Sequence, residues 1–263
     1  MAKMITKVDI HDMLKNAGVS PSDTVLIHTS MRSLGEVEGG CDGVIDGFIS
    51  YLTDGLFLVP THTWANVNKN QPIYDVKNTP PCIGALPTVA AKRPDGIRSL
   101  HPTHSMWAHG KRAAEFVRGE EVSKTPCPAG GAWARLYDED AKIIMLGVGI
   151  DKLTYIHAID EMLDLPERLS EEKELVVIDY CGNEHKVSFR SHSHATSQYF
   201  VNYEKALDYL GIIKRTRLGD ADVLIISAKE LTEALKSFWE KADYDLSYGE
   251  YRDIPEHYYK EEA

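Results

Sequence analysis

The 263-residue sequence has no apolar segment long enough to cross a bilayer. Its longest strongly apolar run, Ile143 to Ile150, has eight residues, whereas a transmembrane helix needs about 20. Residues 1–7 lack the apolar core of a secretory signal. No paired spacing links the cysteines, which are Cys41, Cys82, Cys127 and Cys181. The sequence therefore predicts a cytoplasmic protein with free thiols and no membrane contact.

Basic residues are also in deficit. The chain has 29 Lys and Arg against 40 Asp and Glu, for a formal net charge of −11 and a pI near 5.5. Because binding nucleic acid requires a concentrated basic surface, this charge argues against a nucleic-acid partner and suits a cationic ligand better. With 43% hydrophobic and 26% charged residues, and no linker or repeat, we expect one globular domain over residues 1–263.

Several standard catalytic motifs are missing. The sequence contains neither the phosphate loop G-x-x-x-x-G-K-[ST] nor the nucleophile elbow G-x-S-x-G. Gly147-Val-Gly149 is followed by Lys152 where a dinucleotide-binding loop has glycine. These absences argue against nucleotide hydrolysis, serine hydrolysis and dinucleotide binding.

The patterns that are present predict an α/β fold. A helix begins at the N-cap Thr6, with Asp9 three residues on, and stops at Gly18. A long polar loop covers residues 61–82, and its aromatic residues favour a binding role. The other expected elements are strands at 24–28, 56–59, 142–148 and 223–227, a hairpin of 175–179 with 186–189, helices at 43–52, 86–92, 154–163, 203–210 and 228–242, and a loop at 29–40.

His157 is the most informative single residue. If Thr154 caps the helix, His157 lies in its first turn, where the positive end of the helix dipole disfavours a charged imidazole. The histidine would then stay a neutral base at pH 7. Glu161, one turn along the same face, could orient it or hold a cation. The plainer alternative is a partly exposed helix histidine with a nearby carboxylate.

Two other patterns suggest ligands. The loop from Thr29 to Gly35 follows a buried strand, and its backbone N–H groups, with Ser30, Arg32 and Ser33, could face a phosphate. The clustered histidines allow a zinc site, although Pro102 makes a helical H-x-x-H pair unfavourable. The histidines of that alternative are His101, His104, His109, His192 and His194.

Taken together, the motifs resemble the antibiotic N-acetyltransferases, among which are the aminoglycoside 3-N-acetyltransferases. The matching stretches run from about residue 6 to 235. They are His28-Thr-Ser-Met-Arg-Ser-Leu-Gly35 with Gly39-Gly40, Gly84-Ala-Leu-Pro87, Arg98-Ser-Leu-His-Pro-Thr-His-Ser105 with Gly110, Leu146-Gly-Val-Gly149, Asp151-Lys-Leu-Thr-Tyr-Ile-His157 with Glu161, Gly211-Ile-Ile, and Leu218-Gly-Asp-Ala221.

This resemblance implies a single α/β domain with a mixed central sheet flanked by helices, distinct from the GNAT acetyltransferases. It also implies acetyl-CoA as donor, no metal, and the 3-amino group of a 2-deoxystreptamine ring as acceptor. His157 matches the catalytic base. The expected cofactor-binding residues are His28, Ser30, Met31, Arg32, Ser33, Leu34, Gly35 and Ser105.

The chain also departs from the family pattern. Thr88 stands where many members have Glu, and His192 to Ala195 align with a stretch that carries acidic residues in the classical resistance enzymes. Glu161 and His192 are therefore the expected catalytic partners of His157.

For the reaction, we expect His157 to deprotonate the amine, which then attacks acetyl-CoA directly in a ternary complex. Loop N–H groups or Ser105 would stabilise the oxyanion. Residues expected to bind the acceptor are Trp64, Tyr74, Asp75, Asp160, Glu161 and Asp164. The alternatives are transfer to a non-antibiotic amine, covalent transfer through a cysteine with Cys41 as first candidate, a zinc amidohydrolase, and a non-catalytic binder of CoA or a cation. A homodimer is one expected assembly.

Overall fold

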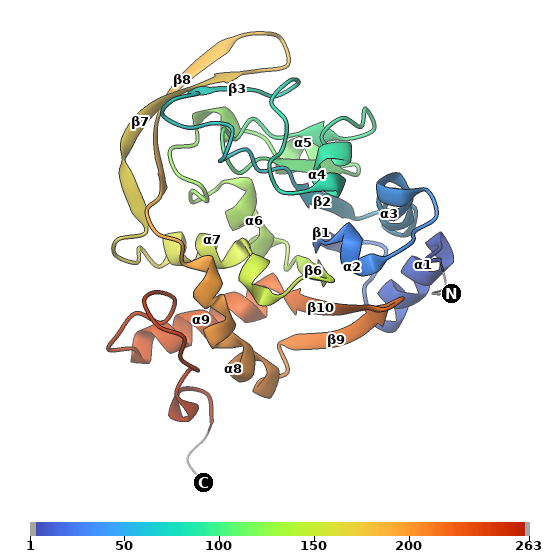
Figure 1. Ribbon diagram of the computed structural model, residues 1–263, viewed down its shortest axis with the longest axis vertical. Coiled ribbons are helices and arrows are strands. Elements are labelled where there is room, and N and C mark those ends of the chain that lie inside the picture. The colour runs from blue at the N-terminus through green and yellow to red at the C-terminus, as the bar shows by residue number, and fades with distance from the viewer. Residues whose placement is uncertain (1–3, 261–263) are drawn as a thin grey trace.

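A seven-stranded mixed sheet forms the centre of the computed structural model, which describes residues 4–260. Its spatial order is β4-β5-β2-β1-β6-β10-β9, and Figure 1 labels the part from β2 to β9. The strands are β1 (Thr24–Thr29), β2 (Leu56–Pro60), β4 (Ile97–Arg98), β5 (Met106–His109), β6 (Lys142–Leu146), β9 (Ile213–Leu218) and β10 (Ala221–Ser227).

The three middle strands are parallel. β1 pairs with β2 on one side and with β6 on the other, so that Leu26 lies opposite both Leu58 and Ile143. The strands outside this trio pair antiparallel. β2 is buried along its whole length, as expected for a strand covered on both faces. Because parallel strands share a direction, the carboxyl ends of β1, β2 and β6 lie at one edge of the sheet.

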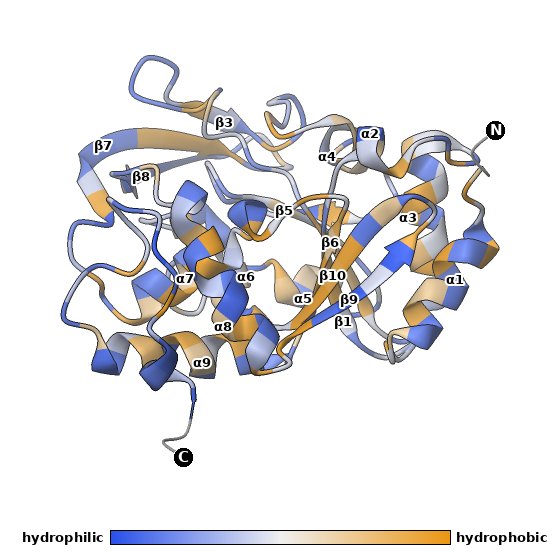
Figure 2. Cartoon of the chain, turned by 60° about the horizontal axis from the view of Figure 1, so that its bottom comes forward, coloured by the Kyte–Doolittle hydropathy of each residue, from blue (hydrophilic) through white to orange (hydrophobic). Residues whose placement is uncertain are grey.

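Helices cover both faces of the sheet. Alternate residues of β1 enter opposite cores: Val25 and Ile27 pack with the first helices of the chain, and Leu26 packs with the later ones. Figure 2 shows the apolar strands enclosed between these layers. One layer contains α1 (Lys7–Asn16), α3 (Gly40–Tyr51) and α4 (Ala85–Ala90), and the other contains α5 (Ala113–Phe116), α6 (Ala132–Asp138), α7 (Tyr155–Met162), α8 (Glu204–Tyr209) and α9 (Ala228–Lys241).

A second, three-stranded sheet contains β3 (Ile73–Asp75), β7 (Leu169–Ile178) and β8 (Glu184–His192). β7 and β8 form the long hairpin at the upper left of Figure 1. The sheet has its own small core, which includes Tyr74, Val177 and Phe189. Because β8 ends at His192, the hairpin delivers this residue back toward the central sheet.

Short 3-10 helices and the chain end complete the fold. The 3-10 helices are η1 (Glu120–Val122), η2 (Ile150–Lys152), η3 (Ser197–Tyr203) and η4 (Glu256–Tyr258). Beyond α9 the chain packs back on the core through Leu246 and Ile254. The Asn202 carboxamide donates to the carbonyls of Leu246 and Glu250 and accepts from Arg252 N–H. The buried carboxamide of Asn202 thus holds the acidic, Tyr-rich tail through three hydrogen bonds.

The expected α/β fold with a mixed central sheet flanked by helices is confirmed. The capping box of Thr6 and Asp9 is present in α1, and the predicted hairpin forms β7 and β8. The ends of the predicted domain, residues 1–3 and 261–263, lie outside the described residues. Within residues 4–260, no helix is both long and apolar enough to span a bilayer.

Two predicted loops were wrong in part. The segment 29–40 contains α2 (Met31–Leu34), one helical turn whose N-cap Ser30 accepts from Ser33 N–H. The segment 61–82 contains β3, whose pairing with β7 is too distant in sequence for local pattern to predict. β9 was missed because its middle residues are charged and mostly exposed, so only Ile213 and Leu218 are buried.

Candidate active site

A cavity of about 780 Å³ opens at the carboxyl ends of β1, β2 and β6. This is the edge of an α/β sheet where ligands usually bind. Its size is typical of a small-molecule site. The lining residues are Ile27, His28, Thr29, Val59, Pro60, His62, Trp64, Ile83, Leu86, Pro87, His104, Val148, Asp151, Lys152, Thr154, His157, Ser191, His192, His194, Ala195, Thr196 and Ser197.

Gly147 brings the segments after β1 and β6 together. Its φ of +65° is left-handed, and a Cβ there would lie 2.5 Å from Ser33 Cβ, so only glycine fits. Ser30 N–H donates to Leu146 O across the same junction, at 3.0 Å. The segment 29–35 is thereby fixed against the turn that leads to α7.

His157 lies in the first turn of α7 and lines the cavity. Its N–H donates to Thr154 O, which confirms the predicted helix position, but no side-chain hydrogen bond of Thr154 caps the helix. The side chain is 13% exposed. Burial is the largest cause that lowers the pKa of His157 well below its usual value, and nearby His192 lowers it further. The imidazole is thus a neutral base at pH 7.

Asp160 is the carboxylate nearest to His157, with Oδ2 4.0 Å from the ring Nδ1. It is 1% exposed, and Arg168 Nε lies 3.5 Å from the same oxygen. Arg168 also pairs with Asp245, at 2.8 Å. Burial raises the pKa of Asp160 to about 7 despite the guanidinium. Neither oxygen of Asp160 has a hydrogen-bond partner among the described residues, so His157 faces this carboxyl group without a hydrogen bond to it.

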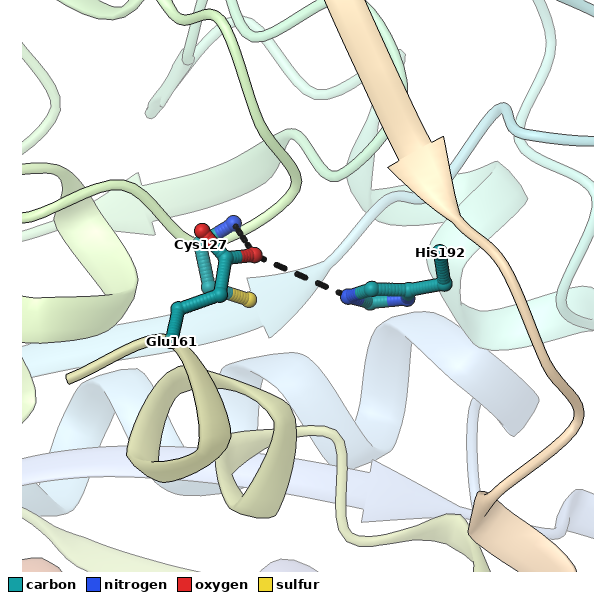
Figure 3. A group of neighbouring side chains, drawn as sticks. All are labelled: Cys127, Glu161 and His192. Carbon is teal, nitrogen blue, oxygen red and sulfur yellow. Dashed lines mark hydrogen bonds and ion pairs between the residues drawn. The ribbon is translucent and has the colours of Figure 1, made fainter. Parts of the chain in front are cut away.

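Glu161 faces a different histidine. Its Oε1 lies 3.7 Å from Nε2 of His192 and accepts the backbone N–H of Cys127 at 2.8 Å (Figure 3). The sequence-based assignment of Glu161 as the partner of His157 was therefore wrong: Asp160, three residues along the helix, takes that place, and β8 brings His192 to Glu161. The site contains a His157–Asp160 pair and a His192–Glu161 pair.

The two histidines belong to a row of imidazoles. Ring centroids are 4.1 Å apart for His157 and His192, 5.1 Å for His192 and His104, and 4.6 Å for His104 and His62. Burial lowers the pKa values of His62 and His104 well below their usual value. This wall of the cavity is therefore rich in uncharged imidazole.

Three buried ring nitrogens on the cavity have no hydrogen-bond partner among the described residues. Two are Nε2 of His28, which is 9% exposed, and Nε2 of His62, which is 4% exposed. The third is Nε2 of His192, which faces Glu161 at 3.7 Å. Burial lowers the pKa of His28 to about 4. Because an unsatisfied buried polar atom is costly, these nitrogens point to hydrogen bonds with a ligand.

The predicted cofactor residues divide into two groups. His28 and Thr29 line the cavity, and the segment Ser30–Gly35 follows directly after Thr29. In that segment Arg32 and Ser33 are exposed, whereas Leu34 is 3% exposed and packs in the core. The side chain of Leu34 therefore cannot contact a ligand in this conformation.

Ser30 to Gly35, Asp160 and Glu161 are not among the residues that line the cavity, and four more predicted residues do not line it either. Ser105 is fully buried, and its hydroxyl donates to Thr61 O, so the proposed oxyanion role has no geometric support. Tyr74 is fully buried in the small sheet and donates to Ser99 O. The Asp75 carboxylate accepts from Asn78, and Asp164 is exposed beyond α7. Sequence proximity to aromatic or catalytic residues was a poor guide at these positions.

Trp64 is brought to the cavity, where it is 51% exposed. His62 was missed and His104 was considered only as a zinc ligand. His62 has the same signal as His28, a histidine at the end of a buried strand, and that rule applied to residues 56–59 would have identified it. Asp151 and Lys152 were also missed as lining residues.

Cys41 and Cys127 bear on the alternatives of cysteine and metal chemistry. Cys41 lies in α3 away from the cavity, and burial raises its pKa. Ligand atoms of Cys127, Glu161 and His192 lie within 4.8 Å of one another and could hold a metal ion. Cys127 is 1% exposed, and burial raises the pKa of its thiol well above the usual value. The predicted zinc set is not assembled: His109 instead contacts Asp95 O.

Comparison with known proteins gives a consistent family. The sequence profile described as aminoglycoside 3-N-acetyltransferase matches residues 26–240. Aminoglycoside N(3)-acetyltransferase IV of a Salmonella species is 28% identical over 187 residues, which are 68% of this chain and 70% of that protein. The aminoglycoside N(3′)-acetyltransferase-like protein YokD of Bacillus subtilis is also 28% identical, over 58% of this chain and 63% of that protein.

Solved structures show the same fold over more of the chain. AAC-IIIb in a binary complex with CoASH has a TM-score of 0.80 at 19% identity, covering 91% of this chain and 97% of that one. YokD has a TM-score of 0.79 at 22% identity, covering 92% and 96%. The expected fold, distinct from the GNAT acetyltransferases, is thereby confirmed.

Proposed function

Because this chain belongs to the aminoglycoside 3-N-acetyltransferase family, we propose that it transfers the acetyl group of acetyl-CoA to a primary amine with His157 as general base. The enzyme class is acetyltransferase, because its relatives are named aminoglycoside N(3)-acetyltransferases. The CoASH complex of a protein with the same fold supports the donor. The observation that carries the proposal is a neutral imidazole, paired with Asp160, on a cavity at the functional edge of the sheet.

The reaction begins with an amine that is protonated at pH 7 and must lose that proton before it can attack. Nε2 of His157 accepts a proton from the amine, and the nitrogen lone pair attacks the thioester carbonyl carbon. The C–N bond forms and the C–S bond breaks. His157 passes its proton to the leaving sulfur, and the second proton that the nitrogen loses is released to solvent. The products are an N-acetylated amine, CoASH and one proton. General base catalysis of this kind contributes about 10²–10⁴-fold to the rate.

Asp160 and Arg168 act through His157. When the imidazole of His157 accepts a proton from the amine, it becomes cationic. The carboxylate of Asp160, 4.0 Å from Nδ1, stabilises that positive charge. Catalytic hydrogen bonds often shorten when substrate is bound. Arg168 holds Asp160 in place and reduces the cost of its negative charge.

Acetyl-CoA is proposed to enter from the side of residues 28–35. The segment follows β1, is exposed at Arg32 and Ser33, and joins the cavity at Thr29. The pantetheine arm would pass His28, which brings the thioester toward His157. This placement rests on the family resemblance and on the adjoining cavity. A location in the cytoplasm, a homodimer and a single domain over residues 1–263 stay predictions.

The test is thiol release from acetyl-CoA on mixing with a panel of primary amines. Wild-type protein is expected to release CoASH in step with amine acetylation detected by mass spectrometry. His157→Ala is expected to lose at least about 100-fold in kcat while keeping its affinity for acetyl-CoA in calorimetry. His257→Ala, at an exposed histidine near the chain end, is the matched control. Near-normal turnover of His157→Ala would remove the proposed base.

A further inference from the structure

The cavity has almost no net charge, although the chain has a formal net charge of −11. Among the described residues that line it, Asp151 is the one carboxylate and Lys152 is the one Lys or Arg. The two pair with each other, with Lys152 Nζ 2.7 Å from Asp151 Oδ2. The acidic residues of the protein are therefore elsewhere, and this lining offers no unpaired carboxylate.

The carboxylates behind the cavity wall face protein groups. Asp160 is 1% exposed and lies between His157, at 4.0 Å, and Arg168, at 3.5 Å, without a hydrogen bond to either. Glu161, whose side chain is 8% exposed, accepts from Cys127 N–H and faces His192. Neither residue lines the cavity. A second or third ammonium group of a ligand would therefore find no free anionic partner there.

The cavity instead offers uncharged hydrogen-bonding groups. Nε2 of His28 and of His62 have no partner within residues 4–260, and burial lowers the pKa of both rings, which stay neutral near pH 7. Hydroxyl side chains of Thr154 and Ser197 add further uncharged groups to the lining. These groups suit hydroxyl or amide groups of a ligand, whereas an extra ammonium group would lose its hydration without an ion-pair partner.

We propose that the acceptor is a primary amine with a single ammonium group whose other polar groups are uncharged, such as an amino alcohol or a monoamino sugar. Compounds with several ammonium groups, including polyamines and aminoglycosides, are then poor acceptors. This inference rests on the proposed acetyl transfer and selects its substrate class. The acidic outer surface attracts any cation at low salt, but that attraction is largely screened at about 0.15 M ionic strength.

The experiment compares acceptors with one and with several ammonium groups at about 0.15 M salt, and the members of the first pair are matched in size. 4-Aminobutan-1-ol and 1,4-diaminobutane have the same chain and differ only in a hydroxyl or a second ammonium group. Glucosamine and gentamicin form a second pair with one and several ammonium groups. We expect kcat/KM at least about 10-fold higher for the first member of each pair, counted per reactive amine.

A charge variant tests the cause of the preference. Ser197→Asp places a carboxylate on the lining, and Ser197→Asn is its uncharged control of similar size. We expect Ser197→Asp to shift the kcat/KM ratio between the diamine and the amino alcohol by about 5-fold in favour of the diamine. Ser197→Asn should leave that ratio unchanged. Thermal unfolding and acetyl-CoA binding of both variants verify that the fold and donor site are retained.

The outcomes separate the two proposals. If wild-type protein releases CoASH with a higher kcat/KM for 1,4-diaminobutane or gentamicin than for its single-amine counterpart, the proposed substrate class is wrong. The proposed acetyl transfer would still stand. An unchanged ratio in folded Ser197→Asp would also overturn it. Failure of every amine to release CoASH would reject the acetyltransferase itself, and the substrate class with it.

Discussion

The His157–Asp160 pair and the His192–Glu161 pair both take their carboxylate from α7, yet the two carboxylates are held in different ways. Asp160 is 1% exposed and balanced by the Arg168 guanidinium, and burial raises its pKa to about 7. Glu161 is satisfied by the neutral N–H of Cys127, at 2.8 Å. A perturbed, buried carboxylate is costly, and such groups concentrate at functional sites. The difference supports the proposal that the first pair carries the chemistry and that the second positions.

The histidines of the two pairs also differ in origin. His157 and Asp160 lie three residues apart on one helix, so their geometry forms as soon as α7 forms. His192 comes from the end of β8, and it reaches Glu161 only when the β7–β8 hairpin is docked. The first pair is a local structure, and the second depends on tertiary packing.

The largest expected effect is on the first pair. At pH 8, where the Asp160 carboxyl is mostly ionised because its pKa is about 7, Asp160→Asn removes the charge that stabilises the imidazolium formed during proton transfer, and kcat is expected to fall about 100-fold. The affinity for acetyl-CoA should be unchanged. Asp164→Asn is the matched control, because Asp164 is exposed and its positive φ is one that asparagine also adopts. A change of less than about threefold in Asp160→Asn would show that His157 does not need this carboxylate.

The contrast between local and tertiary structure also explains what the sequence could predict. The strand ending at His28, the helix carrying His157 and the mixed α/β fold follow from local periodicity and the family motifs. Whether His157 faced Asp160 or Glu161 was not decidable, because residues three and four positions along a helix lie on the same face. The proximity of His192 to Glu161 depends on where a hairpin docks, and no local pattern reports that.

The errors have the same physical origin. Tyr74 and Asp75 were placed at the site because they lie in a long polar loop, but pairing of β3 with β7 takes them into the small sheet. Ser105 belongs to a family motif, yet its hydroxyl serves Thr61. His62 was available from the strand-end rule and was missed because that rule was applied only to β1 and β6.

A second prediction concerns the cost of burying Asp160. The pKa of its carboxyl is about 7 in the folded protein against an ordinary value of 3.8. Between these values the folded state holds a proton that the unfolded chain has released, so Asp160 lowers stability as the pH rises. Asparagine has no such dependence. The unfolding free energy of Asp160→Asn should therefore increase relative to wild type between pH 5 and pH 8, by on the order of 2 kcal/mol.

Urea unfolding at both pH values measures this difference. The unfolding free energy of Asp164→Asn should change with pH as that of wild type does, because Asp164 is exposed. Parallel curves for Asp160→Asn as well would mean that the carboxyl is no more costly to ionise in the folded protein than in the unfolded chain. The pair would then lose the feature that distinguishes it from His192–Glu161.

The smallest expected effect is on the second pair. Glu161→Gln keeps an oxygen that can accept Cys127 N–H, but it removes the charge beside Nε2 of His192. We expect kcat/KM to fall about 10-fold or less, mainly through KM, since His192 is proposed to position rather than to move the proton. Glu171→Gln, at an exposed glutamate on β7, is the control. A kcat loss in Glu161→Gln larger than that of Asp160→Asn would reverse the roles, because the proton acceptor would then be His192, oriented by a carboxylate that a backbone amide holds.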